Sequence, residues 1–328
     1  MTASTIDPFR PAWWLPSPHG QTIGARAIRR RSGVALERER LDTPDGDFLD
    51  LDWAHHPAGG DRPLLVLFHG LEGSARSGYA YSTYRQAHAQ GLDAVGVNFR
   101  SCSGELNRGL RLYHSGETSD PRWVLALLAD RFPGRPLGAV GFSLGGNALL
   151  KLLGEDGSAT PLTAACAISV PFDLAAGGTL LERGLGPGYV WSLLRPLKQK
   201  VRLRAADLGP LIDLERSLAA RSFRDFDDAA TAPLHGFDGA DDYYRRCSSA
   251  AFVERIVTPT LVLHSRDDPF LPPAAIPEDA FAANPALQAH LTDRGGHVGY
   301  LAGPAPWRPR FWAEEQAARW LAARLGAA

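Results

Sequence analysis

The segment Gly141-Phe142-Ser143-Leu144-Gly145 carries the clearest chemical pattern in the chain. It fits Gly-x-Ser-x-Gly, in which a serine stands on a sharp turn between a strand and a helix. An apolar run at residues 137–142 precedes the serine, and a helical pattern at residues 143–154 follows it. The glycines let neighbouring backbone approach closely, and the helix N-terminus favours negative charge beside the serine. The sequence therefore predicts that Ser143 is a nucleophile rather than an idle serine in a glycine-rich turn.

An alcohol attacks poorly at neutral pH, so Ser143 needs a base within hydrogen-bonding reach. For this strand–turn–helix pattern the usual chain order is serine, acid and then histidine. Four histidines follow Ser143, namely His235, His264, His290 and His297. The first lies in a long irregular segment, and the next two lie inside predicted strands. His297 follows the last predicted strand in the glycine-rich loop Arg-Gly-Gly-His-Val-Gly, so we expect His297 to be the base.

A carboxylate is expected after the strand that precedes the histidine, where it would orient the imidazole and stabilise its cationic form. The predicted strand at residues 260–265 is followed by Arg-Asp-Asp-Pro-Phe-Leu-Pro. Asp268 is the favoured acid because the apolar and proline residues after it form a turn typical of this place. Asp267 remains an alternative and would otherwise be a turn residue. Asp293 is a weaker third candidate.

Attack on an acyl group also requires hydrogen-bond donors for the oxyanion that develops. With this type of serine turn, one donor is the backbone N–H of the residue after the nucleophile and another comes from the loop after an early strand. The sequence assigns these donors to Leu144 and Leu71. His69, in the same early loop, is predicted to be a packed histidine that hydrogen-bonds the backbone.

A sheet must bring these residues together, and the sequence predicts one. Continuous apolar runs, such as the one at residues 64–68, are typical of strands buried on both faces of a parallel sheet. The predicted strands lie at residues 34–41, 48–53, 64–68, 92–99, 137–142, 162–170, 260–265 and 287–292. The predicted helices lie at residues 79–90, 118–131, 143–154 and 309–325. Their alternation predicts an α/β fold with a mostly parallel sheet flanked by helices.

The alternation breaks at Pro171 and resumes near residue 258. We therefore expect a core formed by residues 1–170 and 258–328, interrupted by an insertion at residues 171–257. This segment looks irregular, with several glycines and aromatic residues and only helical fragments. An insertion there could cover the ends of the strands, where open α/β sheets bind ligands. We favour this arrangement, in which the insertion is a cap. The alternative is that the insertion only extends the helical layer.

Five segments together with two pieces near the C-terminus resemble the YheT/EMB8-like branch of the α/β-hydrolases, which includes ABHD1/ABHD3-type proteins. The five segments are Trp14-Leu15-Pro16 with His19-Gly20-Gln21-Thr22, HGLEGS at residues 69–74, NFRSCSGELNR at 98–108, YHSGETSD at 113–120 and GFSLGGN at 141–147. The pieces DDPFLP and GGHVGYL continue the likeness near the C-terminus. The resemblance implies an α/β-hydrolase fold and a carboxylesterase-type serine hydrolase with Ser143, Asp268 and His297 as its triad. Ser101 departs from the glycine that similar sequences usually have there.

The segment 98–120 contains polar residues that the triad does not explain. They are Arg100, Glu105, Asn107, Arg108, His114 and Glu117. They could line the substrate pocket, but a buried network that braces the loop is favoured, because buried polar groups must be satisfied and such networks rigidify a site. Cys102 is expected to be a packing residue rather than a reactive thiol.

Composition excludes several classes of function. The 328 residues carry 35 basic and 36 acidic side chains, and the only short basic run is at residues 26–31, so nucleic-acid binding is not expected. Three distant cysteines do not form a disulfide framework or a zinc pattern, which suits a reducing, cytoplasmic compartment. The sequence shows neither a secretory signal nor an 18-residue apolar run. No metal or organic cofactor is expected.

The resulting prediction is a serine hydrolase that cleaves carboxylic esters through an acyl-enzyme intermediate. Two alternatives remain. One is a hydrolase directed at lipids that docks on membranes, suggested by Phe9, Trp13, Trp14, Tyr189 and Trp191, because Trp and Tyr are frequent at membrane interfaces. The other is a binding protein that keeps the fold without activity. The expected substrate is thus a small-molecule or lipid ester.

Overall fold

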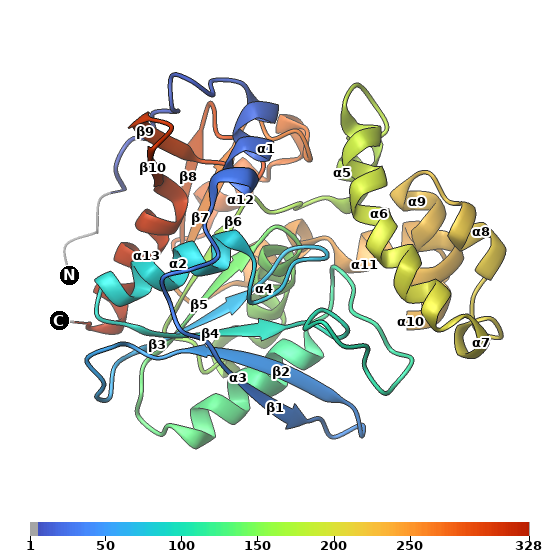
Figure 1. The fold of residues 1–328 in the computed structure, drawn as a ribbon, viewed down its shortest axis with the longest axis horizontal. Helices are drawn as coiled ribbons and strands as arrows, with labels where there is room; N and C mark the ends of the chain where they lie inside the picture. Colours follow the sequence, from blue (N-terminus) through green and yellow to red (C-terminus); the bar gives the residue numbers. More distant parts are fainter. Residues whose placement is uncertain (1–5, 328) are drawn as a thin grey trace.

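The computed structural model describes residues 6–327, and most of its strands form one twisted sheet (Figure 1). The order of its eight strands is β1-β2-β4-β3-β5-β6-β7-β8. The pairs β1–β2 and β2–β4 are antiparallel, whereas all later neighbours are parallel. The strands are β1 (Glu37–Asp42), β2 (Phe48–Ala54), β3 (Leu64–Phe68), β4 (Asp93–Asn98), β5 (Leu137–Phe142), β6 (Ala164–Ile168), β7 (Thr260–Ser265) and β8 (Leu287–Thr292). The predicted α/β class with a mostly parallel sheet is confirmed.

Helices cover both faces of the sheet, so its central strands β3 to β7 are buried at every position. In β3, Leu64 and Val66 pack with α3 and α4 on one face, while Leu65 and Leu67 pack with α2 and α13 on the other. The alternation follows from the two-residue period of a strand. The helical elements around the sheet are α2 (Gly78–Ala89), α3 (Ser119–Arg131), α4 (Leu144–Asp156), η1 (Gly157–Ala159), η4 (Pro273–Ala275), α12 (Glu278–Ala283) and α13 (Trp312–Leu325).

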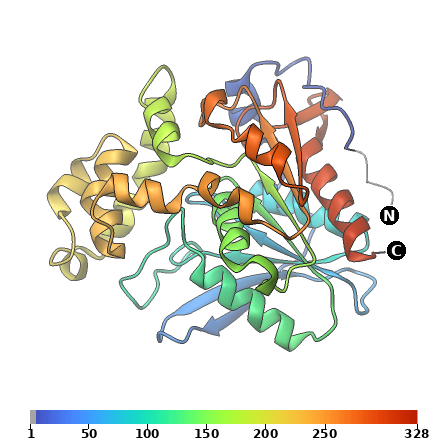
Figure 2. The same cartoon turned by 180° about the vertical axis from the view of Figure 1, so that it is seen from behind.

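The chain between β6 and β7 is a helical insertion, and Figures 1 and 2 show it as a group of helices beside the sheet. Its elements are α5 (Leu174–Leu180), α6 (Gly186–Leu203), α7 (Ala205–Leu208), α8 (Leu214–Ala219), α9 (Phe223–Phe226), η2 (Asp227–Thr231), α10 (Ala232–His235), α11 (Ala240–Cys247) and η3 (Ser249–Arg255). The insertion has an apolar cluster of its own, which includes Leu194, Val201 and Phe226. Segment 171–257 is therefore mostly helical, and the expectation of an irregular chain was wrong. Apart from α6, its helices span eight residues or fewer, which is too short to show a clear period, and the longer α6 contains Pro196, a residue that usually breaks a helix.

A helix near the N-terminus and a hairpin before the last helix were not predicted, and neither was α12. Helix α1 (Pro18–Ile28) lies near the N-terminus, and Ser17 caps it by accepting from the Gly20 N–H at 3.1 Å. Strands β9 (Leu301–Ala305) and β10 (Arg308–Phe311) form a small antiparallel hairpin. The last helix thus begins at Trp312 and not at residue 309, because the preceding residues pair with β9.

Among residues 6–327, no helix is both long enough and apolar enough to span a lipid bilayer.

Candidate active site

Ser143 stands at the turn between β5 and α4 in a strained backbone conformation. Its φ of 51° lies in the left-handed region, which is uncommon for a residue other than glycine. The Ser143 N–H donates to the Ile168 carbonyl on the neighbouring strand at 2.9 Å, which holds the turn. A Cβ on Gly145 would lie 2.4 Å from the Phe68 carbonyl oxygen, so only glycine fits there. The geometry matches the sharp turn predicted from the Gly-x-Ser-x-Gly pattern.

The structure brings Ser143, His297 and Asp268 into one hydrogen-bonded chain. The Nε2 atom of His297 lies 2.8 Å from the Ser143 Oγ, and its Nδ1 lies 2.8 Å from the Asp268 Oδ2. An ionised carboxylate only accepts hydrogen bonds, so Nδ1 carries the proton and Nε2 is free to accept from the serine hydroxyl. Asp268 also accepts from the Phe270 N–H at 2.8 Å, and the Phe270 ring stacks on the imidazole at 4.0 Å.

The alternative acids lie elsewhere. Asp267 accepts hydrogen bonds from the Ser265 hydroxyl and from the Gly296 N–H, so it braces the loop before His297. Asp293 is exposed. This placement agrees with the interpretation of Asp267 as a turn residue.

The three other histidines that follow Ser143 are not part of this chain of hydrogen bonds. His264 is fully buried, with its Nε2 4.0 Å from the Asp268 Oδ2, and burial lowers its pKa to about 4. It is therefore neutral near pH 7 and packs against Phe172. His235 stacks near His114, at 4.6 Å between ring centroids, and His290 lies beside Trp312.

The loop that carries His297 is held by α1, a role that sequence reasoning missed. Thr22 Oγ1 accepts from the His297 N–H at 2.9 Å. Arg29, which caps the C-terminus of α1, donates to the carbonyl oxygens of Val298 at 2.8 Å and Gly299 at 3.0 Å. A Cβ on Gly296 would lie 2.4 Å from the Pro18 carbonyl oxygen, so helix and loop are in close contact. The available signal was the His19-Gly20-Gln21-Thr22 motif, which carried the resemblance but no assigned role.

The two expected oxyanion donors, Leu71 and Leu144, lie beside the serine. Leu144 is the first residue of α4, where backbone N–H groups lack a partner within the helix. The loop around Leu71 is fixed because the N–H groups on either side donate to tyrosine hydroxyls, Gly70 to Tyr79 at 2.9 Å and Glu72 to Tyr113 at 2.7 Å. Within the described residues, the N–H groups of Leu71 and Leu144 have no acceptor. Both residues line the same cavity as Ser143.

His69 packs beneath this loop as predicted. The side chain is fully buried, and its Nε2 accepts from the Phe99 N–H at 3.1 Å. Its Nδ1 therefore carries a proton and donates to the Gly70 carbonyl at 2.8 Å. Burial lowers the pKa of His69 to about 4, which keeps the ring neutral and in this tautomer.

A cavity of about 740 Å³ opens at Ser143 and extends between the sheet and the helical insertion. Ser143, Leu71 and His297 line it from the core, and most of the remaining wall is apolar. Lining residues from the insertion include Leu174, Leu181, Leu185, Tyr189, Leu193, Phe226, Asp227 and Tyr244. A cavity of this size, with apolar walls and polar groups around the serine, is typical of small-molecule sites.

A family model described as the alpha/beta hydrolase fold matches residues 63–304. The chain belongs to the α/β-hydrolase family. An Escherichia coli protein named "Putative esterase YheT" is 42% identical over 97% of this chain and 94% of its own length. The mouse protein named "Phospholipase ABHD3" is 32% identical over 91% of this chain and 74% of its own length. The chain is thus a member of the YheT/ABHD3-type branch, and its activity in the broad sense is that of a hydrolase.

Solved structures show the same fold at low sequence identity. The Pyrococcus furiosus esterase Pf2001 superposes with a TM-score of 0.55 at 15% identity, covering 90% of each chain. A 2,6-dihydroxy-pseudo-oxynicotine hydrolase superposes with a TM-score of 0.56 at 14% identity, covering 94% of this chain and 72% of the other. At such identities the likeness concerns the fold alone.

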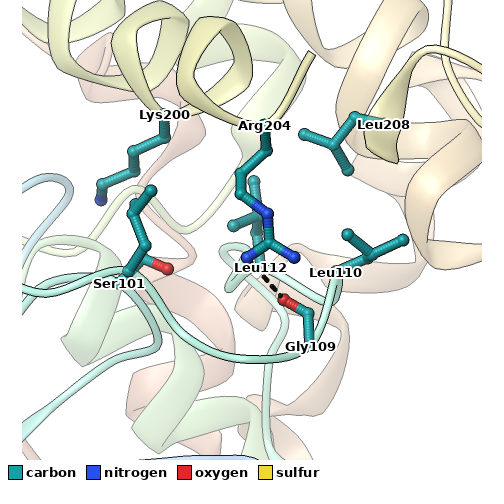
Figure 3. Close-up of a pocket in the computed structure, with 8 residues that line it drawn as sticks. Ser101, Gly109, Leu110, Leu112, Lys200, Arg204 and Leu208 are labelled. Atoms are coloured by element: carbon teal, nitrogen blue, oxygen red, sulfur yellow. Dashed lines mark hydrogen bonds between the residues drawn. The ribbon is translucent and has the colours of Figure 1, made fainter. Parts of the chain in front are cut away.

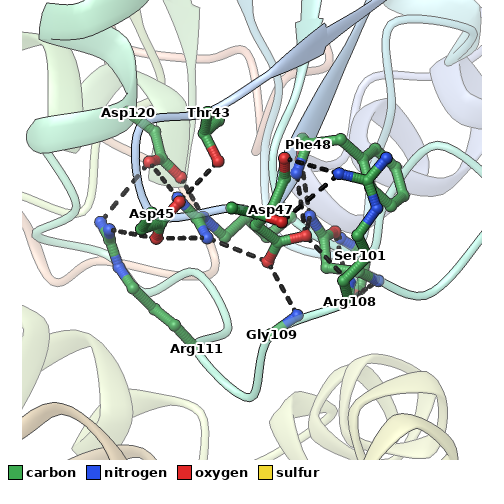
Figure 4. A network of polar contacts seen from close by, with 12 residues as sticks. Thr43, Asp45, Asp47, Phe48, Ser101, Arg108, Gly109, Arg111 and Asp120 are labelled. Carbon is green, nitrogen blue, oxygen red and sulfur yellow. Dashed lines mark hydrogen bonds and ion pairs between the residues drawn. The ribbon is translucent and has the colours of Figure 1, made fainter.

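The polar segment of this α/β hydrolase forms a buried network, as favoured from the sequence, and Figure 4 shows the part around Asp47. The Arg100 guanidinium is only 2% exposed and pairs with Asp120 at 2.7 Å and Asp47 at 3.0 Å. Asn107 donates to the Asp47 Oδ1 at 2.9 Å and to the Phe48 carbonyl. The network ties the loop after β4 to the turn between β1 and β2.

The other polar residues of segment 98–120 differ in their exposure and in their partners. Glu105 is exposed and pairs with Arg40 at 2.7 Å. The Arg108 side chain is also exposed and pairs with Asp42 at 2.7 Å. Glu117 is buried and pairs with Arg111 at 2.6 Å, whereas His114 lines the cavity. The predicted buried network therefore includes only part of segment 98–120.

Two residues near this segment match their predicted character. Burial raises the pKa of the Cys102 thiol to about 11, which suits a packing residue. Ser101 has a φ of 62°, which explains why similar sequences usually have glycine there. The Ser101 hydroxyl accepts from the Asn107 N–H at 3.1 Å.

Proposed function

We propose that this α/β hydrolase is a serine esterase that cleaves carboxylic esters. Ser143 attacks the ester carbonyl while His297 Nε2 takes the hydroxyl proton, and Asp268 stabilises the imidazolium. The backbone N–H groups of Leu71 and Leu144 donate to the oxyanion. The proposal rests on one observation, the 2.8 Å contacts that link the Ser143 hydroxyl through His297 to Asp268 at the wall of a large cavity.

The second half of the reaction uses the same groups. The tetrahedral intermediate collapses, the ester C–O bond breaks, and His297 returns its proton to the leaving alcohol. Water then attacks the Ser143 acyl ester, giving its proton to His297, and the carboxylic acid leaves as Ser143 regains its hydrogen. An ester is preferred over an amide or thioester on the strength of the relatives named esterase and phospholipase.

We further propose that the helical insertion, residues 171–257, is a cap on a core made of residues 1–170 and 258–328. The insertion supplies much of the cavity wall opposite Ser143, from residues such as Leu181 and Tyr189. Tyr189 also hydrogen-bonds His19 in α1 at 3.0 Å, which connects the cap to the core across the cavity. The cap would then set the length and shape of the acyl or alcohol group.

Labelling with a fluorophosphonate probe tests the reaction class. The folded protein should be labelled, and Ser143→Ala should abolish labelling. Ser192→Ala is the matched control, because Ser192 lines the same cavity, and this variant should label like wild type. A folded protein that takes no label, or a Ser143→Ala variant that labels normally, would favour a catalytically silent binding protein instead.

A second candidate function is a lipid hydrolase that docks on anionic membranes. It is favoured by exposed apolar residues and arginines that line the cavity. Ile23 and Leu185 are exposed although both line the cavity, and Arg26 and Arg31 line the same cavity. Exposed apolar residues next to arginines suit an anionic lipid surface. Among the aromatic residues considered from the sequence, Trp191 is 68% exposed and precedes Ser192, which lines the cavity.

The other aromatic residues do not all contribute to this surface. Trp13 is exposed and donates to the Pro304 carbonyl. Phe9 packs against Tyr300, Trp14 belongs to an internal apolar cluster, and Tyr189 lines the cavity.

Co-sedimentation with vesicles that contain anionic phospholipid tests the docking. Leu185 and Leu203 form a matched pair, since both are 63% exposed and lie at opposite ends of α6. Leu185→Ala should reduce the bound fraction, while Leu203→Ala should not. No bound fraction for the wild type would exclude membrane docking and leave the esterase proposal intact.

A further inference from the structure

Asp227 is a carboxylate inside the cavity that the proposed reaction does not use. It begins η2 (Asp227–Thr231), a π-helical turn in the helical insertion. Such turns are rare and are often found at functional sites. The side chain lines the same cavity as Ser143, so a bound ester could reach both.

The contacts of Asp227 leave its charge without a cationic partner. Tyr244 Oη donates to its Oδ2 at 2.8 Å, and Thr231 Oγ1 donates to its Oδ1 at 2.7 Å. Both donors are neutral, and no lysine, arginine or histidine among residues 6–327 forms an ion pair with Asp227. A carboxylate can accept about four hydrogen bonds, so it retains free acceptor capacity. Burial accordingly raises the pKa of Asp227 to about 6.

The neighbouring carboxylate of Asp228 has the partners of an ordinary surface residue. Asp228 pairs with Arg216 at 2.9 Å, accepts from the Ala240 N–H at 3.1 Å, and does not line the cavity. Its pKa is lowered by these contacts, with the backbone hydrogen bond as the largest cause. A carboxylate that faces a cavity without a cationic partner lowers the stability of the fold. The contrast with Asp228 therefore points to a ligand group that compensates the charge of Asp227.

Aromatic rings surround Asp227 on the cavity side. Tyr243, Tyr244 and Phe226 all line the cavity, and the two tyrosine rings lie 5.3 Å apart between centroids. The faces of aromatic rings attract cations. Tyr243 also connects this end to the nucleophile, because its hydroxyl accepts from the Ser115 N–H at 2.8 Å. Asn147, one turn after Ser143 in α4, donates to the Ser115 carbonyl at 2.8 Å.

We propose that Asp227 and the rings of Tyr243 and Tyr244 form a subsite for an alkylammonium group of the ester substrate. The carboxylate compensates the positive charge, and the rings replace its hydration shell. Arg26 and Arg31 line the cavity on the side of α1, so a cationic group is drawn toward Asp227 and away from those arginines. The inference rests on the proposed function, because the ester bond of the same molecule is cleaved at Ser143.

The test compares two esters of the same shape, butyrylcholine and 3,3-dimethylbutyl butyrate, in which carbon replaces the charged nitrogen. The wild type should hydrolyse the cationic ester with a kcat/KM about tenfold higher or more, the expected effect of one charge-assisted contact. Asp227→Asn keeps the size of the side chain and should remove this preference by slowing only the cationic ester. Asp228→Asn is the matched control and should retain the preference.

Two results would overturn the subsite. One is a wild type with equal kcat/KM for both esters. The other is an Asp227→Asn variant that melts at a lower temperature and loses activity on both esters equally, since Asp227 would then only connect η2 to Tyr244. If Asp227→Asn does not fold, Asp227→Ser is the second variant and carries the same prediction.

A binding measurement separates the subsite from the reaction. Benzyltrimethylammonium should bind to Ser143→Ala in calorimetry, and about tenfold more weakly once Asp227→Asn is added. Binding of this cation without any ester hydrolysis would support the subsite and contradict the esterase proposal. Ester hydrolysis without either cation binding or ester preference would contradict the subsite alone.

Discussion

At the scale of single residues, two adjacent aspartates have different positions and therefore different proposed roles. Asp268 contacts His297 Nδ1 directly, at 2.8 Å to its Oδ2, while Asp267 bonds the backbone of Gly296 in the loop before it. The sequence favoured Asp268 because of the turn that follows it. It could not settle the matter, because which of two neighbouring side chains points at the imidazole depends on backbone geometry beyond β7.

Asp268→Asn should lower kcat by about 10⁴-fold, because the amide favours the wrong imidazole tautomer. Asp267→Asn should cost much less, since it weakens only the bracing of the loop. Steady-state kinetics on a p-nitrophenyl ester measure both effects, with circular dichroism to verify folding. Equal losses in the two variants would refute the assignment.

At the scale of elements, α1 is the clearest feature that sequence reasoning did not find. The apolar runs of β3 to β7 predicted the sheet correctly, because parallel strands that are buried on both faces are mostly apolar. Helix α1 has no such run, and only Gln21 and Ala25 in it are buried. Its contribution is polar and specific, as Arg29 connects the loop of His297 to Glu314 in α13 at 2.8 Å.

Breaking this connection should affect stability and activity separately. Arg29→Met leaves Glu314 buried and unpaired, which should lower the free energy of unfolding by about 3–5 kcal/mol. The double variant Arg29→Met/Glu314→Leu should recover much of that stability, because no charge remains buried. It should not recover kcat, because the carbonyls of Val298 and Gly299 still lack their donor.

Urea denaturation and ester hydrolysis on the same samples measure the two quantities. Full recovery of kcat in the double variant would show that Arg29 contributes to stability only. Loss of stability in the double variant as large as in Arg29→Met would contradict the explanation by an unpaired buried charge.

At the scale of the whole molecule, the helical insertion is attached directly to the loop that carries Leu71. Lys200 in α6 pairs with Glu72 at 2.6 Å, and both side chains are largely buried. A second attachment is made by Arg204, which donates to the Asn107 carbonyl at 2.7 Å. Arg204 also donates to the Gly109 carbonyl at 3.4 Å, the contact that Figure 3 shows. The sequence predicted an insertion at residues 171–257 but not these contacts, because they join residues that are 95 to 128 positions apart.

Lys200→Met should lower kcat, because it leaves Glu72 without its cationic partner beside the Leu71 N–H, the proposed oxyanion donor. A buried charge without its partner should also cost about 3–5 kcal/mol of unfolding free energy. Arg204→Met is the control, since it detaches α6 from loop 107–109 without touching Glu72, and it should lower kcat much less. A larger loss of kcat in Arg204→Met would show that the attachment of the cap, rather than Glu72, matters.

The proposed reaction depends above all on Ser143 as the nucleophile. The kcat for ester hydrolysis by purified Ser143→Ala, with its folding verified by thermal melting, measures this role. We expect a decrease of about 10⁶-fold, the loss typical of removing the serine of such a triad. Activity of Ser143→Ala within tenfold of the wild type would show that Ser143 is not the nucleophile.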